Sequence, residues 1–411
     1  MRMSRLAAWC LAATAFTGGY VMPAVAQDKV RFQQDRFAIG FWVDPPADEN
    51  MARYYHDIAV ANFTLVIGGF GATTPETVQQ QLRLCEKYNL RAIVSRAGLP
   101  PAELPEGPAC WGYMIRDEPG AADFPGLRTA VDEIRAARPG RFGYINLFPN
   151  YAPAWALGTA TYDEHVRRFA DEVDTDVLSM DHYPMMQPGA DSRDAYCANL
   201  EVMRRESVRK GVPHWNFFNT MPFGPHFDPT EHSIRWQMMT SIAYGSKGLL
   251  YFCYWTPRGG EFPKGGAIIT AEGRKTRHYE QARRLNAAVK AMGPALMQLT
   301  STGVVRVKPD EGKTEALQQT PFRVLDGGTH GDYLVGMFRH ADGRRAVMLT
   351  NYDYLYTSWP TVEFDVDPAS VREVCQETGR EVPVLDDSPA MDGLQLSLDA
   401  GGGRLFLLPA R

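Results

Sequence analysis

Short apolar runs rich in β-branched and aromatic residues recur along the first three quarters of the chain, with polar stretches between them. The runs begin near Phe37, Phe63, Leu90, Cys110, Arg141, Thr175, Val212 and Ser246. Successive runs start about 30 residues apart, which is the length of one strand–helix unit. The pattern therefore predicts eight β-strands in a repeating β/α arrangement.

Amphipathic helices are predicted between most of these strands. The clearest begins at Pro75, after Thr74, since threonine is a good N-cap and proline suits the first helical position. Further helices are predicted over 124–138, 163–173, 192–210, 230–244 and 274–299. The strand at Leu90 is followed by the proline-rich loop GLPPAELPEGP, so its helix is expected to be short or absent.

The alternation of strands and helices predicts parallel pairing and an α/β fold, and eight units suit a closed (β/α)8 TIM barrel. The alternative is an open doubly wound sheet, which would carry a G-x-G-x-x-G phosphate turn that this sequence lacks. After Thr300 short strand-like runs and turn signals replace this pattern. We therefore expect a barrel over 27–299 and an accessory antiparallel β-sandwich over 300–411.

The first 26 residues have the pattern of a secretory signal peptide. Arg2 and Arg5 precede an apolar run, and Ala24-Val25-Ala26 forms a cleavage site before Gln27. We therefore expect an exported protein, periplasmic or extracellular. No later stretch has the ~18 uninterrupted apolar residues of a membrane span, so no membrane insertion is expected.

Composition adds few constraints on partners. The chain has 43 Lys and Arg against 48 Asp and Glu, a net charge of −5, and no basic run that would favour nucleic acid. Five cysteines follow the signal peptide, too few and too scattered for a disulfide framework. If one disulfide forms, Cys85 and Cys110 are the expected pair, and buried thiols are the alternative. No cysteine or histidine spacing indicates a metal site, no cofactor is expected, and the oligomeric state stays open.

Barrel active sites lie at the carboxyl ends of the strands, and the residue types there indicate the chemistry. Carboxylates, amides and aromatics dominate these positions, and no G-x-S-x-G elbow is present. Such a set suits a carbohydrate, because sugar C–H faces stack on rings and hydroxyls bind carboxylates and amides. The candidate substrate-binding residues are Trp42, Asp44, Arg116, Asp117, Tyr183, Asn216, Asn219, Tyr254 and Trp255.

The segments GYMIRDEP (112–119), DVLSMDHYP (176–184) and SIAYGSKGLLYFCYW (241–255) resemble the barrel glycoside hydrolases. In the large retaining clan of these enzymes the fourth strand ends Asn-Glu-Pro, and the glutamate is the acid/base. The tripeptide here is Asp117-Glu118-Pro119, so aspartate replaces asparagine. That clan also has a nucleophilic glutamate on the seventh strand, where this chain reads HWNFFNT without a carboxylate.

The resemblance implies glycoside hydrolysis, which requires one protonated and one ionised carboxyl group. Glu118 is the candidate general acid and Asp181, at the end of the sixth strand, is the candidate second carboxylate. Loop carboxylates Asp44, Asp228, Glu231 and Glu261 are reserve candidates. Two alternatives remain open: a carbohydrate-binding pseudoenzyme, favoured by the missing seventh-strand glutamate, and a metal-dependent barrel hydrolase.

Overall fold

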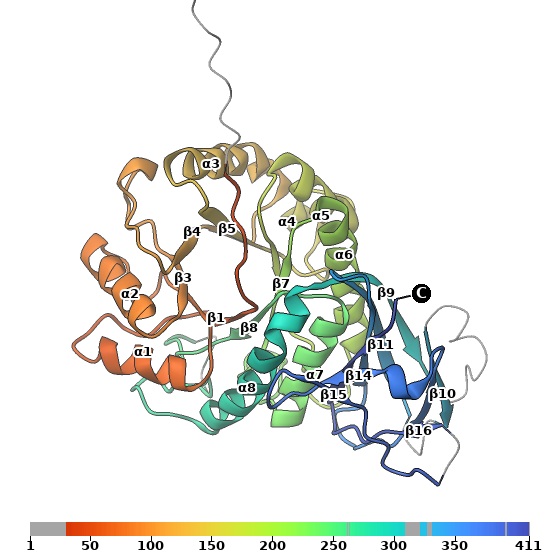
Figure 1. Ribbon diagram of the computed structural model, residues 1–411. Coiled ribbons are helices and arrows are strands. Elements are labelled where there is room, and N and C mark those ends of the chain that lie inside the picture. Colours follow the sequence, from red (N-terminus) through yellow and green to blue (C-terminus); the bar gives the residue numbers. More distant parts are fainter. Residues whose placement is uncertain are drawn as a thin grey trace, which may run out of the picture.

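A sheet of eight parallel strands forms the centre of the molecule (Figure 1). The computed structural model describes residues 30–260, 262, 264–308, 321–326, 331–390 and 393–410. The strands of this sheet are β1 (Ala38–Phe41), β2 (Leu65–Ile67), β3 (Arg91–Val94), β4 (Cys110–Asp117), β5 (Phe142–Leu147), β6 (Leu178–Asp181), β7 (His214–Asn219) and β8 (Gly248–Phe252). They pair in the order β1-β8-β7-β6-β5-β4-β3-β2.

The two edge strands of this order, β1 and β2, are joined through Thr64. The Thr64 backbone N–H donates to the carbonyl oxygen of Ile39 at 2.9 Å, and the Ile39 N–H donates to the Thr64 hydroxyl at 2.8 Å. These bonds close the sheet, so the prediction of a (β/α)8 barrel is confirmed and the open doubly wound alternative is wrong.

Helices surround the barrel, as Figure 1 shows. They are α1 (Met51–Val60), α2 (Pro75–Lys87), α3 (Phe124–Ala137), α4 (Ala154–Leu157), α5 (Tyr162–Glu172), α6 (Arg193–Lys210), α7 (Glu231–Ala243) and α8 (Arg277–Met297). The Thr74 hydroxyl caps α2 by accepting the Thr77 N–H, as its sequence predicts. Only a 3₁₀ turn, Pro101–Glu103, follows β3, in line with the proline-rich loop. The sequence reading did not identify α1 or the short α4.

The barrel interior is packed with large side chains. Trp215 fits inside because the facing residue is Gly248, where a Cβ would lie 2.3 Å from the indole. The Trp215 Nε1–H donates to Gln34 Oε1 at 3.0 Å, and Phe32 packs on Trp111 with ring centroids 5.4 Å apart. The segment before β1 therefore covers the amino-terminal end of the barrel, which leaves the carboxyl end for a site.

Two antiparallel sheets follow the barrel. One has the order β10-β13-β16, and the other β15-β14-β17-β12-β11-β9. Their strands are β9 (Leu299–Val307), β10 (Phe322–Asp326), β11 (Tyr333–His340), β12 (Arg345–Asn351), β13 (Thr361–Phe364), β14 (Arg372–Val374), β15 (Glu381–Pro383), β16 (Leu394–Gln395) and β17 (Gly403–Leu408), with a 3₁₀ turn at Pro368–Ser370. Val362 and Phe364 of the smaller sheet share one hydrophobic core with Val347 and Phe406 of the larger, so the two sheets form a sandwich.

The sandwich is fixed to the barrel along α6 and α7. Gly336 of β11 lies so close to α7 that a Cβ there would be 2.3 Å from the carbonyl oxygen of Ala243. Arg306 of β9 pairs with Asp194 of α6 at 2.6 Å and with Asp332 at 2.7 Å. The accessory sheets thus pack directly on two barrel helices.

Two expectations concern the cysteines and the membrane. Cys85 and Cys110 are both buried free thiols, so the suggested disulfide between them is wrong. No helix in the described residues is long and apolar enough to cross a membrane. The signal-peptide prediction falls on residues 1–26, which lie outside the described residues.

Candidate active site

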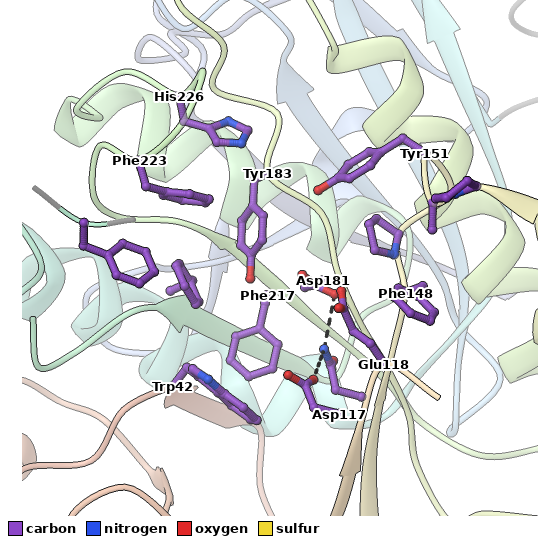
Figure 2. A pocket seen from close by; sticks show the side chains of 16 residues that line it. Trp42, Asp117, Glu118, Phe148, Tyr151, Asp181, Tyr183, Phe217, Phe223 and His226 are labelled. Atoms are coloured by element: carbon purple, nitrogen blue, oxygen red, sulfur yellow. Dashed lines mark hydrogen bonds between the residues drawn. The ribbon is translucent and has the colours of Figure 1, made fainter. Parts of the chain in front are cut away.

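A cavity of about 540 Å³ opens at the carboxyl end of the barrel strands (Figure 2). This is a typical size for a small-molecule site, for which the range is roughly 300–1,000 Å³. Its lining comprises Trp42, Asp117, Glu118, Asn146, Phe148, Pro149, Tyr151, Ala152, Pro153, Asp181, Tyr183, Phe217, Phe223, His226, Phe252 and Phe262. Three carboxyl groups and a wall of aromatic rings thus share one cavity.

Asp117 enters the cavity because β4 is irregular. Its pairing with β5 shifts between Met114 and Arg116, which leaves Asp117 opposite Asn146. A regular strand would place Arg116 and Glu118 on one face and Asp117 on the other. The extra residue in β4 offsets this alternation, as a β-bulge does. The Asn146 side-chain amide then donates to Asp117 Oδ1 at 3.2 Å.

Glu118 also reaches the cavity, although it directly follows Asp117. Its φ is +46°, a left-handed conformation that is strained for a glutamate, and its N–H donates to the carbonyl oxygen of Asn146 at 2.8 Å. β4 has already ended at Asp117, and Pro119, which follows Glu118, is buried. Backbone strain of this kind often occurs where a side chain must be aimed at a functional site.

Asp181, at the end of β6, is the buried member of the group. It is 8% exposed, and the Asn146 side chain donates to its Oδ1 at 3.2 Å. The same Asn146 nitrogen therefore bridges Asp117 and Asp181 (Figure 2). Asn146 is itself oriented by the Ser179 hydroxyl, which donates to its Oδ1 at 3.0 Å. This network fixes the spacing of the carboxyl groups of β4 and β6.

Burial and mutual repulsion alter the acidity of all three groups. Burial, and then the charge of Asp117, raises the pKa of Glu118 to about 7. Burial, and then the charges of Glu118 and Asp117, raises the pKa of Asp181 well above its usual value, although hydrogen bonds from Tyr183 and Asn146 oppose this. Desolvation also raises the pKa of Asp117. The group therefore retains a proton near neutral pH, and its members titrate together.

Aromatic side chains form the other walls of the cavity. Trp42 packs edge-on against Phe217 with ring centroids 5.5 Å apart, and Tyr183 lies 5.1 Å from Phe252. Figure 2 shows the Tyr183 and Tyr151 hydroxyls directed toward the carboxyl groups. Among the described residues that line the cavity there is no lysine or arginine. The lining thus suits a neutral or cationic ligand with apolar faces.

Five of the residues that the sequence singles out meet in this cavity: Trp42, Asp117, Glu118, Asp181 and Tyr183. Asp44 and Arg116, which the sequence also singles out, do not line it. Asp44 is buried and accepts the N–H groups of Phe70 and Gly71, each at 2.9 Å, so it anchors the loop after β2. The Arg116 side chain is 58% exposed and pairs at 3.9 Å with Asp123.

Asn216 and Asn219 of β7 are also outside the cavity. Strand alternation directs Trp215 and Phe217 into the barrel and Asn216 toward the helices. There the Asn216 amide donates to the Tyr196 hydroxyl at 2.6 Å. Asn219 Oδ1 accepts the N–H of Met185 at 3.1 Å and so orders the loop after β6.

Tyr254 and Trp255, which follow β8, are packing residues rather than sugar platforms. Tyr254 stacks on Phe41 with ring centroids 4.4 Å apart, and Trp255 packs edge-on against Tyr54 at 5.0 Å. Both are almost fully buried, at 1% and 8% exposure. Their N–H groups donate to the carbonyl oxygens of Trp42 and Val43, at 2.9 and 3.2 Å, so the chain after β8 runs beside the residues that follow β1. Neither lines the cavity.

The reserve carboxylates lie elsewhere. Asp228 pairs with Arg277 at 2.7 Å and with His278 at 2.9 Å, and Glu231 pairs with Arg284 at 2.7 Å. Neither lines the cavity. Glu261 falls outside the described residues.

The structure adds cavity residues that the sequence reading did not assign to the substrate. Asn146 is the bridging amide. It lies one residue before the end of β5, where alternation with Phe142 and Tyr144 places it inside the barrel. Tyr151 and Phe223 come from loops, where no periodic signal fixes direction. His226 lines the cavity from a loop as well. Burial lowers the pKa of His226, so its imidazole is neutral near pH 7. Within the described residues no cluster of three His, Cys, Asp or Glu side chains has the arrangement of a metal site.

No family model and no curated protein matches the sequence. Solved structures do match. A GH42 β-galactosidase from G. stearothermophilus aligns with TM-score 0.61 and 9% identity, over 92% of this chain and 100% of that chain. A glycoside hydrolase family 5 protein from Bacteroides vulgatus aligns with TM-score 0.57 and 10% identity, over 93% of each chain.

A β-galactosidase from the psychrophilic Marinomonas ef1 aligns at 12% identity over 62% of this chain. The chain spans only 60% of that enzyme, with a TM-score of 0.45. The two longer alignments include both the barrel and the sheets that follow it. By its fold, the chain is a (β/α)8 barrel of the kind found in the glycoside hydrolases of families 5 and 42.

Proposed function

We propose that this protein is a glycoside hydrolase that cleaves an O-glycosidic bond of a poly- or oligosaccharide. The observation that carries the proposal is the meeting of Glu118 and Asp181 in one aromatic cavity at the carboxyl end of the barrel. The structural neighbours with the same fold are described as β-galactosidase and glycoside hydrolase, which supports the same reaction class.

In the proposed reaction Glu118 is the general acid. A pKa of about 7 lets its carboxyl group hold a proton near neutral pH and donate it to the leaving oxygen. Asp181 acts at the anomeric carbon, either by activating a water molecule or by direct attack. The reaction needs the proton on Glu118 and the charge on Asp181. Burial and the neighbouring carboxylates disfavour that charge, and hydrogen bonds from Tyr183 and Asn146 favour it. The aromatic walls bind the C–H faces of the sugar.

A carbohydrate-binding pseudoenzyme is the second candidate, and β7 provides the observation that favours it. β7 contributes Phe217 to the cavity and no carboxylate, whereas the retaining clan has its nucleophile on that strand. Incubating the mature protein with a panel of neutral polysaccharides and aryl glycosides separates the two functions. Release of reducing ends supports the hydrolase, and binding without release supports the pseudoenzyme.

The charge of Asp117 should affect how kcat/KM depends on pH. The rate should fall as pH rises through the pKa of the acid, because deprotonated Glu118 has no proton to donate. Asp117→Asn removes the charge that helps to raise this pKa, so the alkaline limb of kcat/KM should move to lower pH. The pKa of Glu118 should fall only part of the way back to the usual glutamate value, because burial is the larger cause of its rise. Profiles of kcat/KM against pH for both proteins measure it.

Asparagine can still accept the Asn146 hydrogen bond, so the cavity should keep its shape in this variant. Asp228→Asn is the matched control, since Asp228 is a carboxylate outside the cavity. An alkaline limb that stays in place in Asp117→Asn, or that moves to higher pH, would contradict the coupling of Asp117 to Glu118.

We also propose that the protein is exported and that the mature chain begins at Gln27 or within a residue or two. The basic start, apolar run and Ala-Val-Ala sequence support this. Amino-terminal sequencing of protein recovered outside the cytoplasm tests it. Recovery of the chain with Met1 intact would contradict the proposal.

A further inference from the structure

Asp117 is the one carboxyl group of the cavity lining that the proposed reaction does not use. Glu118 supplies the acid and Asp181 the second carboxylate, and Asp117 lines the same cavity beside them. Unlike the buried Asp181, Asp117 is exposed, so a ligand can reach it. Among the described residues, Asn146 is the one hydrogen-bond partner of its side chain, at 3.2 Å. Asp117 is therefore available to a bound molecule.

No positively charged side chain of the lining balances Asp117. The described lining residues include no lysine or arginine, and His226 is neutral near pH 7. Arg116 precedes Asp117 in the chain, but its side chain lies outside the lining and pairs with Asp123 at 3.9 Å. The charge of Arg116 lowers the pKa of Asp117, and desolvation raises it by more. The lining is therefore short of positive charge.

The third carboxyl group also makes the cavity more repulsive. The charge of Asp117 raises the pKa of both Glu118 and Asp181. The barrel glycosidases that the chain resembles have a neutral asparagine directly before the glutamate of the fourth strand, and this chain has an aspartate there. An asparagine could bind a sugar hydroxyl group without adding this repulsion. A ligand with a positive charge, in contrast, would offset it.

The features around Asp117 suit an organic cation. Within the part of the chain that the structure describes, no three His, Cys, Asp or Glu side chains are arranged to hold a metal ion. Trp42 and Phe217 line the cavity with ring centroids 5.5 Å apart, and Figure 2 shows the Asp117 carboxyl group directed toward the side that Trp42 lines. Aromatic rings attract ammonium groups as well as the C–H faces of sugars. A carboxylate among such rings suits a sugar that carries a protonated amine.

The position of Asp117 relative to Asp181 indicates which carbon of the sugar carries the amine. The Asn146 side-chain nitrogen donates to one oxygen of each carboxyl group at 3.2 Å, so these two oxygens are no farther apart than twice this distance. In the proposed reaction Asp181 acts at the anomeric carbon. Asp117 is then within reach of a substituent on the adjacent ring carbon, C2.

We infer that the cavity takes glycosides of 2-amino-2-deoxy sugars, with the C2 ammonium group of the reacting sugar bound by Asp117. The inference rests on the proposed function and specifies its substrate class as sugars with a free amine. A 2-acetamido group has no charge to offset the carboxylates, and a 2-hydroxyl group offers a hydrogen bond from a neutral donor. Hydrogen bonds between two charged groups are stronger than those with a neutral partner.

Matched aryl glycosides test the inference. Nitrophenyl α- and β-glycosides of glucose and galactose are compared with their 2-amino-2-deoxy and 2-acetamido-2-deoxy analogues. Values of kcat/KM are measured at about pH 6, where a sugar amine is protonated. The proteins are the wild type, Asp117→Asn and the control Asp228→Asn, whose carboxylate lies outside the cavity. The thermal unfolding midpoint of each variant shows whether it is folded.

For at least one sugar, the wild-type protein should hydrolyse the 2-amino substrate with a higher kcat/KM than either analogue. Asp117→Asn should reduce the ratio of kcat/KM for the 2-amino substrate to that for the 2-hydroxy substrate by ~10–100-fold, the usual contribution of a hydrogen bond to a charged group. The ratio removes effects of Asp117 that both substrates share, and Asp228→Asn should preserve it. The inference is overturned if the wild type prefers the 2-hydroxy or 2-acetamido substrates, or if folded Asp117→Asn keeps the wild-type ratio.

Binding measurements separate failure of this inference from failure of the proposed function. The methyl 2-amino-2-deoxy glycosides and the methyl glycosides of the same sugars are titrated into the wild-type protein in a calorimeter. Hydrolysis of 2-hydroxy substrates without any preference for the amines would overturn the inference and leave the proposed function intact. Tighter binding of the amines without hydrolysis of any substrate would support recognition of the amine and contradict the proposed function. If the amines are neither bound nor hydrolysed, the inference is wrong.

Discussion

Glu118→Gln should reduce the hydrolysis of natural glycans by ~10²–10⁴-fold, the usual contribution of general acid catalysis. Glutamine keeps the size and hydrogen-bonding shape of the side chain but has no acidic proton to donate. Substrates with activated leaving groups, such as dinitrophenyl glycosides, need little protonation and should be much less affected. Measuring kcat/KM for both substrate types in the wild-type and variant proteins gives the comparison.

Two checks accompany this measurement. The thermal unfolding midpoint of Glu118→Gln should be equal to or above that of the wild-type protein, because the variant removes a carboxyl group with a raised pKa from a crowded group. Equal losses on activated and natural substrates would contradict the assignment of Glu118 as acid. Intact hydrolysis of a natural glycan would exclude Glu118 from the reaction altogether.

Asp181→Asn should decrease turnover on both substrate types, since its role is at the anomeric carbon and does not depend on the leaving group. The expected loss is at least the ~10²–10⁴-fold of a missing general base. Asparagine can still accept the Asn146 hydrogen bond, so the packing around β6 is preserved. The kinetic signature therefore separates the two carboxyl groups, because only Glu118→Gln should spare activated substrates.

Asp181→Asn should also lower the pKa of Glu118, because each of the two carboxyl groups disfavours ionisation of its neighbour. The alkaline limb of the residual activity should consequently lie at lower pH than that of the wild-type protein. If Asp181→Asn keeps full activity, the second carboxylate is another member of the group, and Asp117 becomes the candidate.

Much of the fold follows from periodicity alone. Short apolar runs at the spacing of a strand–helix unit predict the barrel, and the Thr74-Pro75 pair predicts where α2 begins. Asp181 follows the same logic, because Val177, just before β6, and Ser179 and Asp181 within it alternate on the inward side. Alternation also explains why Asn216 is outside, since Trp215 and Phe217 on either side of it point inward.

The site itself depends on features that periodicity does not contain. The irregular pairing of β4 brings Asp117 inward, and the left-handed backbone at Glu118 then brings in its neighbour. Neither has a clear sequence signal, because bulges and strained turns are set by tertiary packing. Tyr254 and Trp255 lie beyond the end of β8 at Phe252, so strand alternation does not predict that their rings pack on Phe41 and Tyr54.

The roles of Glu118 and Asp181 are tested most directly by comparing four proteins in parallel for the release of reducing ends from one responsive polysaccharide. These are the wild type, Glu118→Gln, Asp181→Asn and the matched carboxylate control Asp228→Asn. We expect wild type and Asp228→Asn to release reducing ends at similar rates, and both cavity variants to be slower by ~10²-fold or more. Equal release by all four proteins, or loss confined to Asp228→Asn, would contradict the claim that Glu118 and Asp181 perform the reaction.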